Sequence, residues 1–430
     1  MNFNIITLGC KVNQYESQAM KETLFKAGFT LSENKDKADI TIINTCTVTS
    51  VSDAKNRKII HKARRNNPDG IVVLTGCMPQ AFPDDFSTFE DCDIVLGNFC
   101  RNDLLPSIEQ YLIDHKQIIS IKENQEKSPK YEKLSVNDFG EHTRAFVKIE
   151  DGCNRFCSYC IIPYARGRVR SKDIEDLKVE VENLANNGYK EVVLVGINLS
   201  AYGQDIGKTL CDAVEAVCEN EKILRVRLGS LEPEQMDIDV INRLSKQKKL
   251  CPQFHLSLQS GCDETLKRMN RHYDTALYAE IVSNLRNAFK NSAMTTDVMV
   301  GFAGETEEEF IKSLEFVKSI GFSKVHTFPY SRRKGTVADK APNQVNEKIK
   351  GERSKLMINA TENSRIDFMK SQIGLIEPVL FETMKNDNYC VGYTPNYTPV
   401  RLYTNNNLCG EIYDVKIIDF KDDYCIGELV

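Results

Sequence analysis

Short apolar runs alternate with amphipathic stretches along the first hundred residues of the chain. The runs lie at 3–8, 39–44, 71–75 and 93–96, and each has the length and composition of a β-strand. Strands that alternate with helical stretches are typical of βα units on a parallel sheet. We therefore predict a parallel βα domain over residues 1–114.

A charged and irregular stretch follows this domain. Residues 115–140 lack a clear period, and positions 122–129 read Lys-Glu-Asn-Gln-Glu-Lys-Ser-Pro. This composition is typical of a linker rather than of a packed element. We therefore expect a domain boundary here.

The alternation of strands and helices resumes after the linker. Helical patterning, as at 174–188 and 305–320, separates six further apolar runs, at 145–149, 191–195, 223–228, 253–258, 294–300 and 324–329. Residues 141–369 therefore predict an incomplete parallel β/α barrel, a partial (β/α)6 barrel, with its active site at the C-terminal ends of the strands.

The last part of the chain changes to short β-rich runs. Those at 378–382, 399–403 and 415–420 are separated by Asn- and Gly-rich turns, so residues 371–430 predict a small β-barrel. The expected fold class is α/β, with an N-terminal parallel βα domain, a partial barrel and a small C-terminal β-barrel.

Composition places the chain among globular proteins. It has 430 residues, 41% hydrophobic and 27% charged, which suits two or three compact units. The net charge of −5 neither favours nor excludes a nucleic-acid partner, because a local patch can bind phosphates.

Cysteine content and the N-terminus indicate the compartment. The fifteen cysteines are an odd number, so they cannot all pair internally, and metal ligation is the better interpretation. The first residues lack a basic stretch and predict a strand, not a secretory signal. No apolar run approaches the roughly 20 residues that span a bilayer. We expect a cytoplasmic protein without a membrane partner, since a reducing compartment keeps thiols available for metal.

Three cysteines share a position directly after predicted strands. Cys10, Cys46 and Cys77 follow the first three apolar runs. Because the C-terminal ends of parallel strands lie along one edge of a sheet, these thiols can converge on one metal cluster. The alternative is that each is an ordinary buried cysteine. Cys92 and Cys100 flank the fourth run without sharing this position, and we interpret them as structural.

A C-x3-C-x2-C loop follows the first strand of the predicted barrel. Cys153, Cys157 and Cys160 suit three irons of a 4Fe–4S cluster, which leaves the fourth iron open for S-adenosylmethionine (SAM). Reductive cleavage of SAM there yields a 5′-deoxyadenosyl radical. We predict a radical-SAM enzyme with Tyr159 beside the adenine. Two other interpretations of the loop are a structural zinc site and an electron-transfer cluster. A zinc site is disfavoured because no His or Cys closely follows Cys160 as a fourth ligand.

The chain resembles the radical-SAM methylthiotransferases along essentially its whole length. The motifs LGCKVNQYE at 8–16, NTCTV at 44–48 and GCM at 76–78 look like the three N-terminal ligand sites of that family, and 153–167 looks like its radical-SAM loop. The resemblance implies a second 4Fe–4S cluster on Cys10, Cys46 and Cys77. It also implies two roles for SAM, as methyl donor to sulfur and as radical source.

Two motifs also indicate a branch of the family. LGCKVNQYE and IIPYARG are most similar to the branch that adds a methylthio group to C2 of N6-threonylcarbamoyladenosine at position 37 of tRNA. Related branches act on isopentenyladenosine in tRNA or on a ribosomal-protein aspartate. The resemblance thus implies the tRNA anticodon stem-loop and an electron donor as partners. A cysteine-metal RNA-binding protein without catalysis is the distant alternative.

Strand-end residues of the predicted barrel are expected to bind SAM. Residues 195–198 lie where radical-SAM enzymes often have a Gly-Gly-Glu-like turn that meets the SAM amino group, but the second Gly and the Glu are absent here. Capping of neighbouring helices is the alternative for the polar residues, and a simple turn for Gly301. His326 and Tyr330 are expected near the nucleobase, with a structural role as the alternative. The expected SAM-binding residues are Gly196, Asn198, Arg227, Ser230, Gln259, Asp297 and Gly301.

Basic residues gather in three segments that we expect to contact RNA phosphates. The first predicts a basic amphipathic helix, with an ordinary solvated face as its alternative. The other two are expected at the barrel mouth. The segments contain Lys55, Arg57, Lys58, Lys62, Arg64 and Arg65; Arg166, Arg168, Arg170 and Lys172; and Arg332, Arg333 and Lys334.

The C-terminal β-domain resembles the TRAM domain of the family, an RNA-binding barrel. Acidic residues outnumber basic ones between Ser371 and Val430, so no broad phosphate-binding surface is expected. Its tyrosines are candidates for base stacking, with packing as the alternative. They are Tyr389, Tyr393, Tyr397 and Tyr403.

Overall fold

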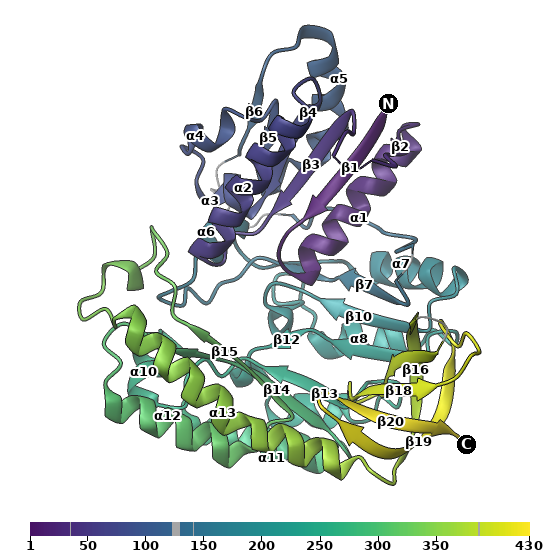
Figure 1. Ribbon diagram of the computed structural model, residues 1–430, viewed down its shortest axis with the longest axis vertical. Helices are drawn as coiled ribbons and strands as arrows, with labels where there is room; N and C mark the ends of the chain where they lie inside the picture. Colours follow the sequence, from purple (N-terminus) through teal and green to yellow (C-terminus); the bar gives the residue numbers. More distant parts are fainter. Residues whose placement is uncertain (35, 123–129, 141, 386–387) are drawn as a thin grey trace. The chain divides into compact units, whose positions relative to one another are not determined.

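A computed structural model describes residues 1–34, 36–122, 130–140, 142–385 and 388–430 (Figure 1). Most of the predicted linker motif at 122–129 therefore lies outside the described residues. The chain forms two compact units. Unit 1 comprises Met1–Val136, Glu150–Lys172 and Ser331–Asp339, and unit 2 comprises Asn137–Ile149, Asp173–Tyr330 and Lys340–Val430.

Unit 1 is built on a six-stranded parallel sheet, as the sequence predicts. Its strand order is β2-β1-β3-β4-β5-β6. The four predicted strands are confirmed, and two short strands extend the sheet. The strands are β1 (Asn2–Thr7), β2 (Thr30–Leu31), β3 (Ile40–Thr45), β4 (Ile71–Gly76), β5 (Ile94–Leu96) and β6 (Ile118–Ser120). β6 lies at the start of the stretch that was expected to be a linker.

Both faces of this sheet are buried. Ile42 packs in one apolar cluster with residues such as Leu24, and its neighbour Ile43 packs in another with Ile60. Successive side chains of a strand point to opposite faces, so the near-continuous apolar runs of β3 and β4 are those of a sheet covered on both sides. The connecting helices are α1 (Lys11–Lys26), α2 (Ser50–Asn66), α3 (Cys77–Ala81), α4 (Phe86–Phe89) and α5 (Leu104–Asp114).

The six predicted barrel strands are also confirmed, and they form two parallel sheets in unit 2. One has the order β11-β10-β7 and the other β12-β13-β14-β15. Gly229 alone separates β11 from β12, so the chain passes directly from one sheet to the next. The strands are β7 (Arg144–Lys148), β10 (Glu191–Val195), β11 (Arg225–Leu228), β12 (Ser230–Leu231), β13 (Gln253–Leu256), β14 (Ala293–Val300) and β15 (Lys324–Pro329).

Helices connect these parallel strands. The two predicted ones are present as α7 (Ile174–Asn186) and α12 (Glu307–Ile320). Thr306 begins α12 with a capping box: its side chain accepts from the Glu309 backbone, and the Glu309 side chain accepts from Thr306 in return. Further helices are α8 (Leu210–Cys218), α9 (Ile238–Leu244), α10 (Asp263–Arg268) and α11 (Thr275–Ala288).

A small closed β-barrel ends unit 2, as predicted. Its strand order is β16-β17-β18-β20-β19, and its interior contains apolar residues such as Phe381 and Val400. A long helix that the sequence pattern did not predict, α13 (Glu347–Ser371), leads into it. The strands are β16 (Ile376–Lys385), β17 (Tyr389–Tyr393), β18 (Pro399–Tyr403), β19 (Ile412–Lys421) and β20 (Tyr424–Leu429).

The helices were compared with the length and apolar content of membrane-spanning helices. Within the described ranges, none combines the length and the apolar content that a membrane crossing needs.

Candidate active site

The three N-terminal cysteines lie at one edge of the sheet of unit 1. Cys10 precedes α1, Cys46 follows β3, and Cys77 begins α3 directly after β4. Strands β1, β3 and β4 are neighbours in the sheet, so the sequence-predicted convergence of these strand ends is observed. Burial, followed by the charge of Cys77, raises the pKa of the Cys46 thiol to about 11.

Two glycines allow this close approach. Gly9 has φ +107°, and a Cβ there would lie 2.5 Å from the Cβ of Cys46. Gly76 has φ +99°, and a Cβ there would lie 2.5 Å from the carbonyl oxygen of Thr45. Only glycine adopts such backbone angles without strain and leaves that space empty. The glycine before the cysteine in the first and third motifs is thus a structural requirement of the edge.

Asparagine side chains tie the cysteine-bearing turns together before any metal is considered. The Asn13 amide nitrogen donates to the carbonyl oxygens of Leu8, at 2.8 Å, and Thr45, at 2.9 Å. Asn56 donates to the carbonyl oxygen of Cys46 at 2.7 Å. These bonds fix the backbone next to Cys10 and Cys46, so the thiols are held by a preformed frame.

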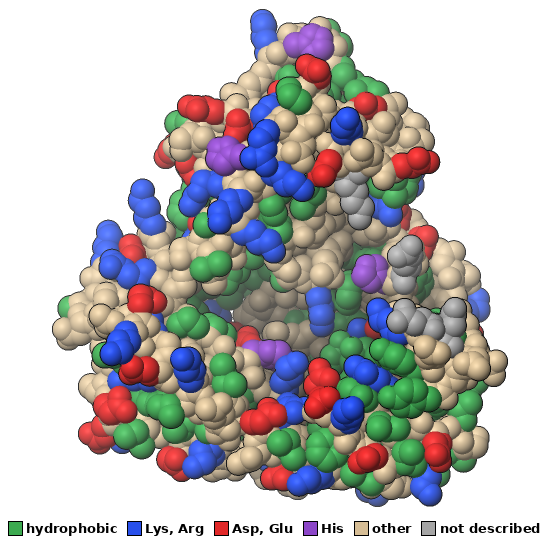
Figure 2. Space-filling model, in the orientation of Figure 1, with side chains coloured by type: hydrophobic (Ala, Val, Ile, Leu, Met, Phe, Trp, Pro, Cys, Tyr) green, Lys and Arg blue, Asp and Glu red, His purple; other side chains and the backbone are tan. Residues whose placement is uncertain are grey.

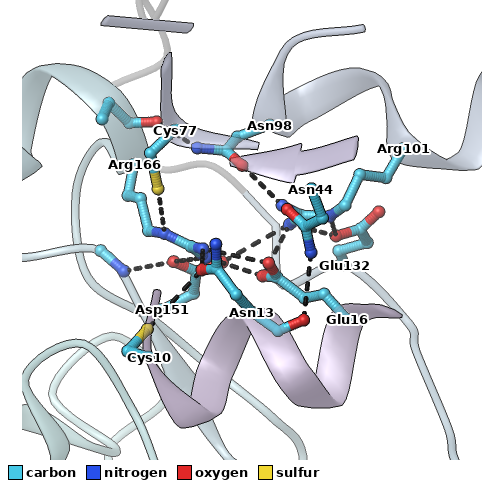
Figure 3. A network of polar contacts seen from close by, with 12 residues as sticks. Cys10, Asn13, Glu16, Asn44, Cys77, Asn98, Arg101, Glu132, Asp151 and Arg166 are labelled. Carbon is cyan, nitrogen blue, oxygen red and sulfur yellow. Dashed lines mark hydrogen bonds and ion pairs between the residues drawn. The ribbon is translucent and has the colours of Figure 1, made fainter. Parts of the chain in front are cut away.

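Arg166 joins this edge from the end of α6 (Ile162–Arg166), the helix that follows the cysteine loop (Figure 3). Its Nε donates to Cys77 Sγ at 3.3 Å. One terminal nitrogen donates to Glu16 at 2.7 Å and to Asp151 at 3.3 Å, and the other donates to Asn13 at 2.8 Å. Burial lowers the pKa of Arg166, but Cys77, Glu16 and Asp151 raise it well above its ordinary value. The guanidinium is therefore a fixed positive charge beside a cysteine sulfur.

The loop that contains the other three cysteines also belongs to unit 1. A short antiparallel pair, β8 (Glu150–Asp151) with β9 (Arg170–Ser171), closes its base. Gly152 has φ +87°, and a Cβ there would lie 2.0 Å from the carbonyl oxygen of Arg168. The Cys153 amide donates to the Gly167 carbonyl at 2.9 Å, which holds the loop on the turn that follows α6. Cys153, Cys157, Cys160 and Tyr159 are half-buried, so a ligand can reach them.

The donor sets suit iron–sulfur clusters better than a single metal ion. Among the described residues, no three His, Cys, Asp or Glu side chains are arranged to bind one ion. A 4Fe–4S cluster holds its cysteine ligands farther apart than one ion does, and it takes thiolates. Two sets of three free thiols, one at a strand edge and one on a half-buried loop, supply the ligands that such clusters take.

Four basic residues that follow the cysteine loop were expected to contact RNA, and for three of them the expectation is wrong. Arg166 and Arg170 are buried, and both pair with Asp151. Lys172 is buried as well and donates to a tyrosine hydroxyl and a backbone carbonyl. A buried charge with internal partners is not available to phosphates. Arg168 alone remains exposed, above the ring of an aromatic neighbour.

The segment after β15 shows the same correction. Arg333 is buried and donates to Asp53 at 2.6 Å and to Thr47 at 2.7 Å. It therefore stabilises unit 1 and does not face RNA, contrary to expectation. Arg332 is exposed but pairs with Asp339 at 3.1 Å, and Lys334 is exposed.

The predicted basic helix is present as α2, and part of its charge is neutralised. Ile60 faces the core, and Arg57, Lys62 and Arg64 form ion pairs with nearby aspartates. Lys and Arg side chains gather over α2 in the space-filling view (Figure 2). Its remaining cations, Lys55, Lys58 and Arg65, are exposed and have no ion pair within the part of the chain that the structure describes.

Two of the expected SAM-binding residues have other roles. Arg227 is buried, pairs with Glu191 at 2.8 Å and donates to the carbonyl oxygen of Pro395 at 2.8 Å. Its guanidinium is occupied by this network, which argues against a contact with SAM. At Gly301, the space that a Cβ would fill holds the Lys350 side chain, and the amide donates to Glu305. This glycine serves a packed turn.

Other expected SAM-binding residues lie at strand ends where a ligand fits better. Gln259 is buried in a left-handed conformation, φ +66°. Its side-chain oxygen lacks a hydrogen-bond partner among the described residues, and such buried oxygens are usually satisfied. Gly196 and Asn198 follow β10 directly, and Ser230 is exposed in β12. The sequence alone gave no signal for the strained backbone of Gln259.

A polar group lies on one face of β13, β14 and β15. His255 Nε2 lies 3.4 Å from an Asp297 carboxylate oxygen, and its Nδ1 lies 3.1 Å from the Thr295 hydroxyl. The ring centroids of His255 and His326 are 6.0 Å apart. Tyr330 does not join them, because it is buried against Phe302. Its expected role at the nucleobase is therefore not supported.

Two of the C-terminal tyrosines pack within unit 2 and are not available for base stacking. Tyr393 and Tyr397 are stacked with ring centroids 4.6 Å apart, and the Arg144 guanidinium lies over both rings. The packing alternative therefore holds for these two. Tyr403 is exposed, and Tyr389 lies beside it.

Comparison with known proteins agrees with these observations. Residues 2–97 match the model of Uncharacterized protein family UPF0004, and residues 147–317 match that of the Radical SAM superfamily. The chain is 38% identical to threonylcarbamoyladenosine tRNA methylthiotransferase MtaB of Bacillus subtilis (strain 168), over 99% of this chain and 95% of that protein. It is 37% identical to tRNA-2-methylthio-N(6)-dimethylallyladenosine synthase of Clostridium botulinum (strain Hall), over 99% and 96%.

Solved structures support the same fold. The radical SAM methyltransferase TsrM from Kitasatospora setae superposes with a TM-score of 0.57 at 15% identity, over 76% of this chain and 74% of that one. The parallel sheets and the matched models define a radical-SAM protein. The chain belongs to the radical-SAM methylthiotransferase family, whose chemistry uses a 4Fe–4S cluster and SAM.

Proposed function

We propose that this enzyme adds a methylthio group to C2 of N6-threonylcarbamoyladenosine at position 37 of tRNA. The similarity to the Bacillus relative supports this substrate, but the Clostridium relative, whose name specifies a dimethylallyl adenosine, is nearly as similar. Overall identity does not separate these substrates. Residues that would contact the N6 substituent therefore have to distinguish them.

The polar face of β13–β15 is the observation that carries the proposal. The alternate residues Phe254, Leu256 and Val298 are fully buried, so His255, Asp297 and His326 share the opposite, open face. A threonylcarbamoyl group has a ureido group, a hydroxyl and a carboxylate that need hydrogen-bond partners. His255 and Asp297 already meet each other, but a dimethylallyl group is a hydrocarbon and would offer no hydrogen-bond partner to the His326 ring, which costs binding energy.

The environment of His326 suits a neutral hydrogen-bonding role. The side chain is exposed on this face, but partial desolvation lowers its pKa, although Asp297 raises it. At neutral pH, the ring is then mostly uncharged, with one nitrogen donating and the other accepting. His255 is oriented by Thr295 and Asp297, so its ring is held before substrate arrives. Because both nitrogens of His255 already meet protein partners, the ring of His326 would be the one that pairs with the ureido group.

The cysteines would hold the cofactors. Cys153, Cys157 and Cys160 would bind one 4Fe–4S cluster with SAM, and Cys10, Cys46 and Cys77 would bind a second. When bound, these groups supply the radical and the sulfur that is transferred. The protein contributes the preformed frame of Asn13 and Asn56 around the second site and the closed base of the loop around the first.

Lys55, Lys58 and Arg65 on α2 would contact tRNA phosphates. They are exposed cations without ion-pair partners in the described ranges, unlike the buried arginines near the cysteine loop. Phosphate contacts position an RNA, while base contacts specify it. A tRNA substrate would place the reaction in the cytoplasm.

Nucleoside analysis of tRNA tests the substrate. Cells that lack this protein and any paralogue should accumulate unmethylthiolated threonylcarbamoyladenosine, and the intact gene should restore the methylthio group. A gene with His326→Phe should restore at least about tenfold less methylthiolated nucleoside than the intact gene, because two or more hydrogen bonds to the substrate would be lost. The control is His142→Phe, which changes an exposed histidine in unit 2 and should restore the methylthio group fully. Loss of methylthio groups from dimethylallyladenosine instead would establish the second candidate substrate.

A further inference from the structure

Arg166 occupies a position that the radical-SAM motif does not explain. It is completely buried, and it comes from the end of the helix after the SAM loop, yet its Nε donates to the sulfur of Cys77 at 3.3 Å. Cys77 lies 89 residues away in the sequence. A residue that follows the loop cysteines in the sequence thus contacts a cysteine of the N-terminal group within unit 1.

We propose that Arg166 is a positioning residue for the N-terminal cysteine site, where it donates a hydrogen bond to the Cys77 sulfur and raises the reduction potential of the cluster there. The inference rests on the second cluster of the proposed function. Hydrogen bonds to cluster sulfurs and the net charge nearby are principal determinants of cluster potentials. A donor with a positive charge stabilises the reduced cluster, which has the greater negative charge.

The geometry around Arg166 limits what else the residue does. Glu16, Asn13 and Asp151 hold its two terminal nitrogens, so the guanidinium plane is fixed and the Nε–H points to the sulfur. Arginine forms such forked contacts with more precision than lysine. The residue therefore has a defined donor direction toward Cys77, which an ion pair alone would not require.

The alternative is a purely structural ion pair, and Arg101 provides a matched control for it. Arg101 is equally buried and also approaches Glu16, at 3.2 Å, and Asp151, at 3.7 Å. Its other partners are Glu132 and Asn98, so no described contact joins it to a cysteine sulfur. Changing Arg101 perturbs the same carboxylates without touching Cys77.

Removal of Arg166 need not unfold the protein. Glu16 keeps its contact with Arg101, and Asp151 keeps Arg170 at 2.9 Å. Neither carboxylate would be left buried without a cation, which is the usual reason that breaking a buried pair is severe. Arg166→Gln retains a neutral donor, and Arg166→Lys retains the charge without the fork.

The test uses the full-length chain with Cys153, Cys157 and Cys160 all changed to Ala, so that only the N-terminal site retains its cysteines. Reconstituted protein is titrated electrochemically, and the reduced cluster is followed by electron paramagnetic resonance. Arg166→Gln should shift the midpoint potential to a more negative value, and Arg166→Lys should give an intermediate shift. Arg101→Lys should leave the midpoint unchanged.

The outcomes distinguish failure of the role of Arg166 from failure of the proposed function. A cluster that is present with the same midpoint in Arg166→Gln overturns the role of Arg166 and leaves the proposed function intact. Equal shifts in the Arg166 and Arg101 variants also overturn it, because the effect would then be structural. A parent variant that binds no cluster overturns both. A shift confined to the Arg166 variants, with iron and sulfide content preserved, supports the inference.

Discussion

The two cysteine groups of unit 1 are assembled in opposite ways. Cys153, Cys157 and Cys160 lie within eight consecutive residues, whereas Cys10, Cys46 and Cys77 span 68 residues and meet only because β1, β3 and β4 are neighbours in the sheet. The loop depends on local backbone geometry. The strand edge depends on the packing of a whole sheet, so its thiols are sensitive to changes at a distance.

Their surroundings differ as well. The loop cysteines are half-buried, which suits a cluster that binds SAM. At the strand edge, Cys46 and Cys77 are buried, Cys10 is exposed, and a charged side chain contacts the Cys77 sulfur. The two groups therefore differ in that the loop thiols are all half-buried, while the edge combines buried and exposed thiols with an arginine beside one sulfur. Substitutions can separate these two properties.

The largest effect is expected at the loop. Cys157→Ala should abolish both SAM cleavage and methylthio transfer, because one of three thiolates that hold the cluster is lost. Deoxyadenosine formation under anaerobic reduction measures the first activity. Cys218→Ala, another half-buried cysteine, should retain both activities, and SAM cleavage that persists in Cys157→Ala would refute the assignment.

The next effect is expected at the strand edge. Cys46→Ala should abolish methylthio transfer while deoxyadenosine formation continues, because the loop cysteines are unchanged. Iron content should fall toward that of one cluster. The buried Cys92 belongs to the core of unit 1, so Cys92→Ala should cost about 1 kcal/mol of stability and leave both activities. Loss of SAM cleavage in Cys46→Ala would contradict independent sites.

The glycines that precede one cysteine of each group provide a reciprocal test. Gly9→Ala places a Cβ against Cys46 and should impair methylthio transfer, while Gly152→Ala places one against the Arg168 carbonyl and should impair SAM cleavage. A non-glycine residue at such φ values costs about 1–2 kcal/mol before any clash. Gly28→Ala, with φ +86° and nothing within 4 Å, should show the strain alone, as a lower melting temperature with activity retained. Identical effects of Gly9→Ala and Gly152→Ala on both reactions would break the comparison.

The smallest effects on the two reactions are expected among the basic residues near the two groups. Lys58→Ala on α2 should weaken tRNA binding modestly. The slope of the logarithm of affinity against the logarithm of salt concentration should become shallower by about one. Stability should change by less than about 0.5 kcal/mol. Filter binding at several salt concentrations measures the affinity and its slope.

Arg170→Ala, beside the loop, should do the reverse. It removes one buried partner of Asp151, which keeps Arg166, so stability should fall by about 1–2 kcal/mol, with the salt slope of tRNA binding unchanged in the folded fraction. Thermal unfolding followed by circular dichroism measures the loss. A reduced salt slope in Arg170→Ala would restore the original expectation of a phosphate contact.

Most of the fold could be predicted from the sequence because its strands are buried apolar runs. Buried parallel strands of this kind have a distinctive composition, and the runs at 71–75 and 191–195 correspond closely to β4 and β10. Elements without such a signal were missed. β6 is a three-residue edge strand, and α13 combines many charged residues with few buried positions.

By itself, the sequence determined the spacing of Cys153, Cys157 and Cys160 and the placement of Cys10, Cys46 and Cys77 after strands, because both follow from local order along the chain. Only the tertiary structure decided which cations remain available. Arg166 and Arg168 are two residues apart, yet Arg166 is buried and Arg168 is exposed. The difference arises because Glu16, from a helix 150 residues earlier, meets Arg166, and burial of a charge requires such a partner.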